Sequence, residues 1–332
     1  MTDAEGRAID TDRLEAALAR HGVADARVED LRRLTGGASR ETWSFDAVSP
    51  QGRRGLVLRR DPGGALPVSM GRTMEYALLE AAAAGGVPVP TVCFALTAED
   101  ALGSGFVMTR VEGETIPRRI LRDDDYLGAR SAMAAQCGRI AARIHALDLA
   151  GLPDLPGAGD DPARTQIDQY RQLLDAFGEP HPAFELGLCW LEDRLPDGAR
   201  PVTVVHGDFR LGNFVVGTEG IRSVLDWELA HLGDPMEDLG WLCVRAWRFR
   251  GPGPVGGFGS HEDLFAAYEA ESGTLVDPDV VRFWEVFGTL KWGVICIVQA
   301  FTHLQGVHRS VELAAIGRRV AEQEFDLLAM ID

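Results

Sequence analysis

Hydrophobic residues recur along most of this chain at the three- and four-residue spacing of amphipathic helices. One such segment, residues 12–21, ends at Gly22, and shorter apolar runs that predict strands follow it up to about residue 112. The pattern therefore predicts an α+β fold with a small β-rich N-terminal lobe, residues 1–112, and a larger, mainly helical C-terminal lobe, residues 113–332. Helices of the second lobe are expected at 129–147, 166–177, 235–247, 263–271, 279–304 and 311–330.

A glycine-rich turn joins the first two predicted strands, 28–34 and 41–48. The backbone N–H groups of Gly36 and Gly37, together with the hydroxyl of Ser39, could bind a triphosphate there. Because the turn lacks the full GxGxxG spacing, it is also typical of a plain tight hairpin. It indicates nucleotide binding only in combination with other motifs.

The most informative polar residues lie in a segment of strand and loop in the second lobe. An apolar run leads into HGDFRLGN, residues 206–213, and a second apolar run ends at Asp226. An in-line attack on a γ-phosphate needs a carboxylate that orients the acceptor hydroxyl and takes its proton, and oxygen ligands that hold Mg²⁺. Asp208 suits the first role, and Asn213 and Asp226 suit the second. The pattern predicts a small-molecule kinase.

A structural interpretation of the same motif stays open. Gly207 could supply only the backbone freedom of a turn, with Asp208 capping its neighbours. His206 fits a residue that holds the loop better than a second catalytic group.

Arg210 also has two interpretations. It lies two residues after Asp208, where a cation could stabilise charge developing on the transferred phosphoryl group. A structural ion pair with Glu228 or Asp234 is the alternative.

The motif HGDFRLGN and the following VLDWELAHLGDPMEDLGW resemble the aminoglycoside phosphotransferase and choline kinase group. The resemblance runs from about Leu34 to the C-terminus. It implies a bilobal protein-kinase-like fold, ATP and Mg²⁺ as cofactors, and the same roles for Asp208, Asn213 and Asp226. The stretches LTGGASRETW, VLRRDPGG, VFGTLKWGVICIVQA and GRRVAEQEFDLL are most similar to a subfamily related to kinase domains fused to acyl-CoA dehydrogenases. Bacterial relatives of that subfamily phosphorylate hydroxyacyl-CoA intermediates.

Kinases normally contact the phosphates with a lysine of the third strand, but this chain has one lysine, Lys291, and thirty-two arginines. Arg59 ends the apolar run 56–59 and is the expected substitute, because its guanidinium can contact two phosphate oxygens. Arg60 competes with it, since neighbouring residues of a strand face opposite sides.

The helix expected at 71–84 offers a partner for this cation. It contains Glu75 and Glu80, and in the kinase arrangement one glutamate pairs with the phosphate-binding cation. Similarity to the subfamily favours Glu75. The alternative for either residue is an ordinary exposed charge.

The run 105–113 predicts a strand that leaves the first lobe. In kinases this segment holds adenine through backbone groups. We therefore expect main-chain contacts from Arg110 and Val111, with Met108 bordering the pocket. A plain core strand is the alternative.

Composition narrows the setting of this chemistry. The 332 residues, 46% of them hydrophobic, suffice for two substantial cores. Five cysteines occur singly, which argues against a disulfide framework or a zinc site and favours a cytoplasmic protein. Neither a signal-peptide pattern nor an apolar run of membrane-spanning length occurs. A net charge of −17 disfavours nucleic acid and anionic membranes as partners.

The expected partner is a small-molecule hydroxyl acceptor, and its class stays open. The subfamily resemblance favours a hydroxyacyl-CoA or a related hydroxy metabolite. An aminoglycoside or another antibiotic is the alternative, and it would need several carboxylates converging on its ammonium groups. A further alternative is a non-catalytic kinase-like nucleotide-binding module. A homodimer is the candidate assembly.

Overall fold

The computed structural model describes residues 9–34, 41–61, 71–152, 154–157, 159, 161–197 and 201–331. The chain forms two compact units, which are described separately below. Unit 1 comprises residues 1–84 and 89–112, and unit 2 comprises residues 85–88 and 113–332. Among the described helices, none combines the length and the apolar character needed to cross a membrane.

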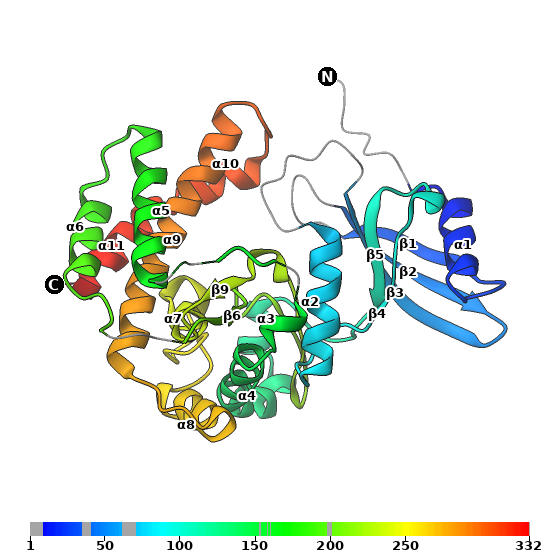
Figure 1. The fold of residues 1–332 in the computed structure, drawn as a ribbon, viewed down its shortest axis with the longest axis horizontal. Helices are drawn as coiled ribbons and strands as arrows, with labels where there is room; N and C mark the ends of the chain where they lie inside the picture. Colours follow the sequence, from blue (N-terminus) through cyan, green and yellow to red (C-terminus); the bar gives the residue numbers. More distant parts are fainter. Residues whose placement is uncertain are drawn as a thin grey trace. The chain divides into compact units, whose positions relative to one another are not determined.

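Unit 1 is a five-stranded antiparallel sheet with one helix on each face (Figure 1). The strands lie in the order β1-β2-β3-β5-β4. They are β1 Arg27–Leu34, β2 Glu41–Ser49, β3 Gly52–Asp61, β4 Val92–Ala95 and β5 Ser104–Thr109. The helices are α1 Thr11–Arg20 and α2 Arg72–Ala84, and a short 3-10 turn, η1 Ala98–Asp100, precedes β5.

Strand alternation gives this sheet two different faces. On one face Leu58 and Val107 pack with Leu18 of α1 in the core of the unit. On the other face Phe106 meets Tyr76 of α2, with ring centroids 5.9 Å apart. The position of a residue along β3 or β5 therefore decides which of the two helices its side chain faces.

Unit 2 is mainly helical. Its helices are α3 Pro117–Arg122, α4 Leu127–His145, α5 Pro162–Phe177, α6 Pro182–Glu192, α7 Met236–Cys243, α8 His261–Ser272, α9 Pro278–Leu304, α10 Val311–Gly317 and α11 Val320–Ile331. Two small antiparallel sheets accompany them: β6 Thr203–Val205 with β9 His231–Gly233, and β7 Phe214–Gly217 with β8 Gly220–Val224.

The long helix α9 organises unit 2. It begins at a side-chain cap, where Oδ1 of Asp277 accepts the N–H of Asp279 at 3.0 Å. It packs against α5, α6, α7, α10 and α11, and it buries Trp284 and Phe287 completely. Helix α7 follows shortly after the segment of strands and loops that contains the HGDFRLGN motif. The contact between α7 and α9 therefore helps to determine which side chains surround that motif.

Most of the expected helices and strands are present, with small shifts at their ends. The single helix expected at 311–330 is wrong, because the chain turns at 318–319 between α10 and α11, just after the poor helix former Gly317. The helix expected at 235–247 is α-helical only to Cys243 and continues as a 3-10 turn, η5 Arg245–Arg248. Helices α3 and α6 were not expected. The expected turn at 35–39 lies outside the described residues.

Gly240 permits the close approach of α7 to α9, and its replacement tests the importance of that approach. A Cβ at this position would lie 2.5 Å from the Cβ of Trp284. Gly240→Ala is expected to lower the free energy of unfolding by about 1–3 kcal/mol, because the two helices must separate. Urea unfolding followed by tryptophan fluorescence measures this loss. Gly151→Ala is the control, because its added Cβ would meet nothing within 4 Å; equal midpoints for the two variants would contradict the argument.

Candidate active site

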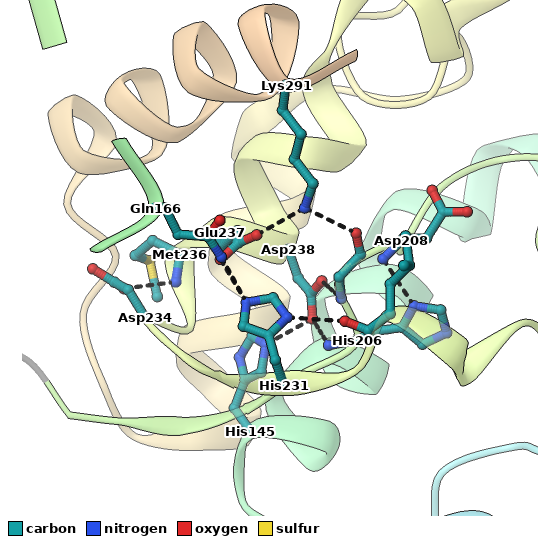
Figure 2. A network of polar contacts seen from close by, with 12 residues as sticks. His145, Gln166, His206, Asp208, His231, Asp234, Met236, Glu237, Asp238 and Lys291 are labelled. Carbon is teal, nitrogen blue, oxygen red and sulfur yellow. Dashed lines mark hydrogen bonds and ion pairs between the residues drawn. The ribbon is translucent and has the colours of Figure 1, made fainter. Parts of the chain in front are cut away.

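The loop that carries the motif follows β6, and the buried carboxylate of Asp238 in α7 holds it. Oδ2 of Asp238 accepts the N–H of His206 at 2.8 Å, and Oδ1 accepts that of Gly207 at 3.0 Å. Nε2 of His145, from α4, lies 3.2 Å from Oδ2 of the same carboxylate (Figure 2). Burial raises the pKa of Asp238, but hydrogen bonds, first that with His145, lower it overall. An ionised acceptor therefore fixes the start of the loop.

His206 and Gly207 shape the loop itself. The ring of His206 is buried, its Nδ1 accepts the N–H of Asp208 at 3.2 Å, and its Nε2 lies 3.1 Å from the carbonyl oxygen of Leu225. Burial lowers the pKa of His206, which favours the neutral ring that this pair of contacts needs. Gly207 has φ +77°, and a Cβ there would lie 2.4 Å from the carbonyl oxygen of Leu229. Both residues thus have structural roles.

Asp208 is the centre of the site, and three N–H donors orient its carboxylate. Oδ1 accepts from Nε of Arg210 at 2.7 Å and from Nε1 of Trp241 at 2.9 Å. Oδ2 accepts from Nδ2 of Asn213 at 2.6 Å. The side chain remains 16% exposed, so that it is fixed in direction and still accessible from solvent.

Arg210 lies beside Asp208 and is itself held by an aromatic ring. Its guanidinium carbon is 4.4 Å from the ring centroid of Trp247, in cation–π geometry. The structure thus brings a cation to the immediate neighbourhood of the expected base.

The hairpin of β7 and β8 brings Asn213 and Asp226 to the same end. Phe214 pairs with Val224, and the N–H of Leu225 donates to the carbonyl oxygen of Asn213 at 2.8 Å. Asp226 follows at once, with φ 60° and ψ 63°. This left-handed conformation is uncommon for a residue other than glycine and is typical of functional positions.

These two residues offer donors that fit Mg²⁺. Nδ2 of Asn213 is engaged by Asp208, so its Oδ1 is the atom it would offer a cation, and Asp226 would add a carboxylate. Among the described residues, no group of three or more His, Cys, Asp or Glu side chains forms a complete metal cage. Mg²⁺ in phosphoryl-transfer sites is usually bound by one or two carboxylates together with substrate phosphates, and so the donor set is suitable.

Asp238 and Trp241 are site residues that the sequence reasoning missed. They lie three positions apart in α7 and reach the loop backbone and the Asp208 carboxylate, respectively. A signal was present, because residues three apart share one face of a helix. Nothing in the sequence alone, however, indicated that this face meets the loop.

In unit 1, Arg59 and Arg60 have different partners. Nη1 of Arg59 lies 2.9 Å from Oε1 of Glu75 in α2, whereas Nε of Arg60 donates to Oε2 of Glu41 at 2.8 Å. The side chain of Glu75 is only 1% exposed, and Glu80 lies at the surface. The structure therefore pairs Arg59 with Glu75 and separates both from Arg60 and Glu80.

Glu75 has a second partner that the sequence reasoning missed. Nη1 of Arg72 donates to Oε2 of Glu75 at 2.5 Å, and Nε of Arg72 donates to Oδ1 of Asp61 at 3.2 Å. Arg72 is buried. The signal was again the three-residue spacing within one helix. Two guanidinium groups thus share one buried carboxylate next to β3.

The remaining residues predicted to contact the nucleotide lie in different environments. Met108 is buried in β5 between Val57 and Val92. The N–H of Arg110 donates to the carbonyl oxygen of Gly55 at 2.9 Å, so any nucleotide contact of its main chain must use its carbonyl oxygen. Val111 follows the end of the strand and is partly buried. The predicted contacts of Gly36, Gly37 and Ser39 lie outside the described residues.

Sequence comparison identifies relatives that are much longer proteins. Acyl-CoA dehydrogenase family member 10 of Mus musculus is 34% identical over 200 residues, which are 58% of this chain and 18% of that protein. Acyl-CoA dehydrogenase family member 11 of the same species is 29% identical over 279 residues, 78% of this chain and 34% of that protein. The chain therefore spans about a fifth to a third of the length of these curated relatives.

Comparison of structures confirms the expected fold. A Ralstonia eutropha protein assigned as an aminoglycoside phosphotransferase has a TM-score of 0.74 and 22% identity, over 97% of this chain and 98% of that one. A choline/ethanolamine kinase family protein of Mesorhizobium loti has a TM-score of 0.63 and 19% identity, over 97% and 95%. A complex of aminoglycoside phosphotransferase APH(4)-Ia with ADP and hygromycin B has a TM-score of 0.63 and 17% identity, over 95% and 96%.

The resemblance inferred from the motif is confirmed at the level of the family. One match to a family model covers all of the site residues discussed above. It includes the Asp208 loop, the hairpin with Asn213 and Asp226, and the pair of Arg59 and Glu75. Residues 30–284, more than half of the chain, match the sequence model of the phosphotransferase enzyme family (APH), and the chain is therefore a member of that family.

Proposed function

We propose that this family member transfers the γ-phosphate of ATP, with Mg²⁺, to a hydroxyl group of a small molecule. The observation that carries the proposal is the arrangement around Asp208, whose carboxylate is oriented by three N–H donors and hydrogen-bonded to Asn213, with Asp226 at the end of the adjoining hairpin. The ADP and AMP-PNP complexes among the similar structures support ATP as the donor.

The proposed mechanism gives each residue of the loop one task. Asp208 orients the acceptor hydroxyl and accepts its proton as the oxygen bonds to phosphorus and ADP departs. Asn213 and Asp226 would hold Mg²⁺, which neutralises charge on the phosphates when bound. Arg210 is close enough to Asp208 to stabilise the charge that develops on the transferred group.

The nucleotide site that we propose uses Arg59 as the phosphate-binding cation. The pair with Glu75 fixes the direction of its guanidinium, as a lysine–glutamate pair does in kinases. Arg60 is engaged by Glu41 on the other face of the sheet, which supports Arg59 over Arg60. Further proposed contacts come from Gly36, Gly37 and Ser39 for the phosphates, and from Met108, the Arg110 carbonyl and Val111 for the base.

For the acceptor we propose a hydroxyacyl-CoA or a related hydroxy metabolite. The likeness to acyl-CoA dehydrogenase family members supports this class, because their name points to acyl-CoA compounds as substrates. An antibiotic is the second candidate, since hygromycin B or spectinomycin is bound in several of the similar structures.

The compartment and the assembly are proposals as well. All five cysteines are free thiols, three of them buried, which supports a reducing cytoplasm. A homodimer stays a prediction.

Removal of the base tests the mechanism. Asp208→Asn is expected to lower kcat at least about 100-fold, because the amide cannot accept the hydroxyl proton. The affinity for ATP should persist, since the phosphate and metal ligands remain. Steady-state kinetics with calorimetric ATP titration measures both, and the exposed Asp168→Asn in α5 is the control. Near-normal turnover of Asp208→Asn would refute the assignment.

The two strand arginines provide a matched pair of variants. Arg59→Met removes one of the two cations that pair with buried Glu75, and Arg60→Met removes a cation from buried Glu41, so both variants should lose stability. Only Arg59→Met should raise the KM for ATP, by at least about tenfold, because a charge-assisted phosphate contact is lost. Equal changes of KM in the two variants would contradict the choice of Arg59.

An acceptor panel tests the class of substrate. ATP consumption with Mg²⁺ is measured with 3- and 4-hydroxyacyl-CoAs, free hydroxy acids, choline and aminoglycosides. We expect turnover with a hydroxyacyl-CoA. Turnover with aminoglycosides alone would replace the proposed acceptor by the antibiotic. Failure to bind Mg-ATP at millimolar concentration would instead indicate a non-catalytic module.

A further inference from the structure

Lys291 is the only lysine of the chain, and the proposed mechanism does not use it. It projects from α9 into the interior of unit 2 and is 5% exposed. Burying an ammonium group costs free energy unless the charge is paired and hydrogen-bonded. The position of this side chain therefore requires specific partners.

Three groups surround the Lys291 ammonium. Nζ lies 3.1 Å from Oε1 of Glu237 and 3.3 Å from the carbonyl oxygen of Gly207. Figure 2 marks the contact between Lys291 and Glu237 with a dashed line. It also lies 4.9 Å from the ring centroid of Trp241. One ammonium thus contacts a carboxylate, a main-chain carbonyl and an aromatic face.

Two of the groups that contact Lys291, the Gly207 carbonyl and the Trp241 ring, are bonded or hydrogen-bonded to Asp208. Gly207 precedes Asp208 in the chain, so that its carbonyl belongs to the peptide group that joins the two residues. Trp241 donates from Nε1 to Oδ1 of Asp208 at 2.9 Å. Lys291 therefore touches both the peptide that carries Asp208 and the indole that orients its carboxylate.

We propose that Lys291 is a positioning residue, which fixes the main chain and the carboxylate of Asp208 together from the interior side of the loop. This inference rests on the proposed function, because it takes Asp208 as the base. A carboxylate displaced by about 1 Å would no longer reach the acceptor hydroxyl in the orientation for attack, and displacements of this size lower turnover strongly.

The charge of this residue is maintained by Glu237. Burial lowers the pKa of Lys291, but the Glu237 carboxylate more than offsets this and raises it above its ordinary value. Burial likewise raises the pKa of Glu237, but His231 and Lys291 lower it to about 2. Nε2 of His231 lies 3.0 Å from Oε2 of Glu237 and 3.1 Å from Nε2 of Gln166. The ammonium thus remains charged, and its partner Glu237 is in turn held by His231 and Gln166.

Lysine suits this position better than arginine. An ammonium is compact, and its three N–H bonds diverge, so it can meet three groups in different directions. A guanidinium presents its donors in one plane and occupies more volume. This difference explains how one lysine can persist in a chain that uses arginine elsewhere.

Kinetic experiments separate positioning from plain stabilisation. Lys291→Met nearly keeps the side-chain volume and removes the positive charge, but it leaves the buried Glu237 carboxylate without this cation. The double variant Lys291→Met/Glu237→Gln removes that carboxylate charge as well. We expect the folded double variant to lose at least about tenfold in kcat, with KM for ATP within about twofold of wild type. Arg282→Met is the control, because Arg282 is another cation of α9 and pairs with Glu285 at 3.0 Å, away from the loop.

A spectroscopic readout does not depend on turnover. Protein labelled with ¹⁵N-lysine should give a single side-chain ammonium signal, because the chain contains one lysine. We expect that signal to shift in Trp241→Phe and in Asp208→Asn, but not in Arg282→Met. If wild type fails to turn over any acceptor, the proposed function fails, and this signal alone then decides whether Lys291 is coupled to Asp208.

Three results would overturn the proposal. The first is a kcat of the double variant within threefold of wild type. The second is a parallel loss of kcat, ATP binding and thermal stability, because it would indicate a purely structural role. The third is an ammonium signal that ignores the changes at both Trp241 and Asp208.

Discussion

The candidate site depends on one buried carboxylate, that of Asp238. It accepts the two N–H groups that begin the loop of Asp208, and His145 of α4 contacts it from another direction. Residues at the start of a tight loop have no regular backbone partners, and an unpaired buried N–H costs free energy comparable to a lost hydrogen bond. Because Asp238 satisfies two of them from a helix that also supplies Trp241, the position of Asp208 follows from the position of α7.

Each unit uses a buried glutamate that is shared by two partners. In unit 1, Glu75 binds Arg59 and Arg72, and in unit 2, Glu237 binds Lys291 and His231. Sharing fixes the carboxylate in one orientation, and hence fixes each cation, because a second partner excludes rotation about the terminal bond. Such networks are sensitive to the loss of one member, since the others remain buried without compensation. Under the proposed function, they provide rigidity at the places where phosphoryl transfer would require it.

The sequence was sufficient to predict the two-part α+β fold, the loop of Asp208, and the association of Asn213 with Asp226. These features follow from local patterns, namely apolar periodicity and the spacing of polar residues around strand ends. Whether Arg59 or Arg60 faces Glu75 depends on strand parity, which the register of β3 with β5 shows and the sequence alone does not. Arg72 left one local signal, its three-residue spacing from Glu75, whereas Asp238 and Trp241 could not be found in this way. Their roles arise from packing between helices and loops that are distant in sequence, and such contacts leave no local periodicity.

The distribution of cations in this chain follows from the geometry of their partners. A phosphate presents oxygens that a planar guanidinium can meet two at a time, so arginine can replace lysine at the end of β3. On the interior side of the loop, the partners of Lys291 are a carboxylate, a main-chain carbonyl and an indole face. A guanidinium is larger and presents its donors in one plane, so it suits three partners of different kinds less well than an ammonium does. The preference of this chain for arginine extends to the buried residues Arg59, Arg60 and Arg72, but at position 291 the proposed positioning role favours a small cation with diverging N–H bonds.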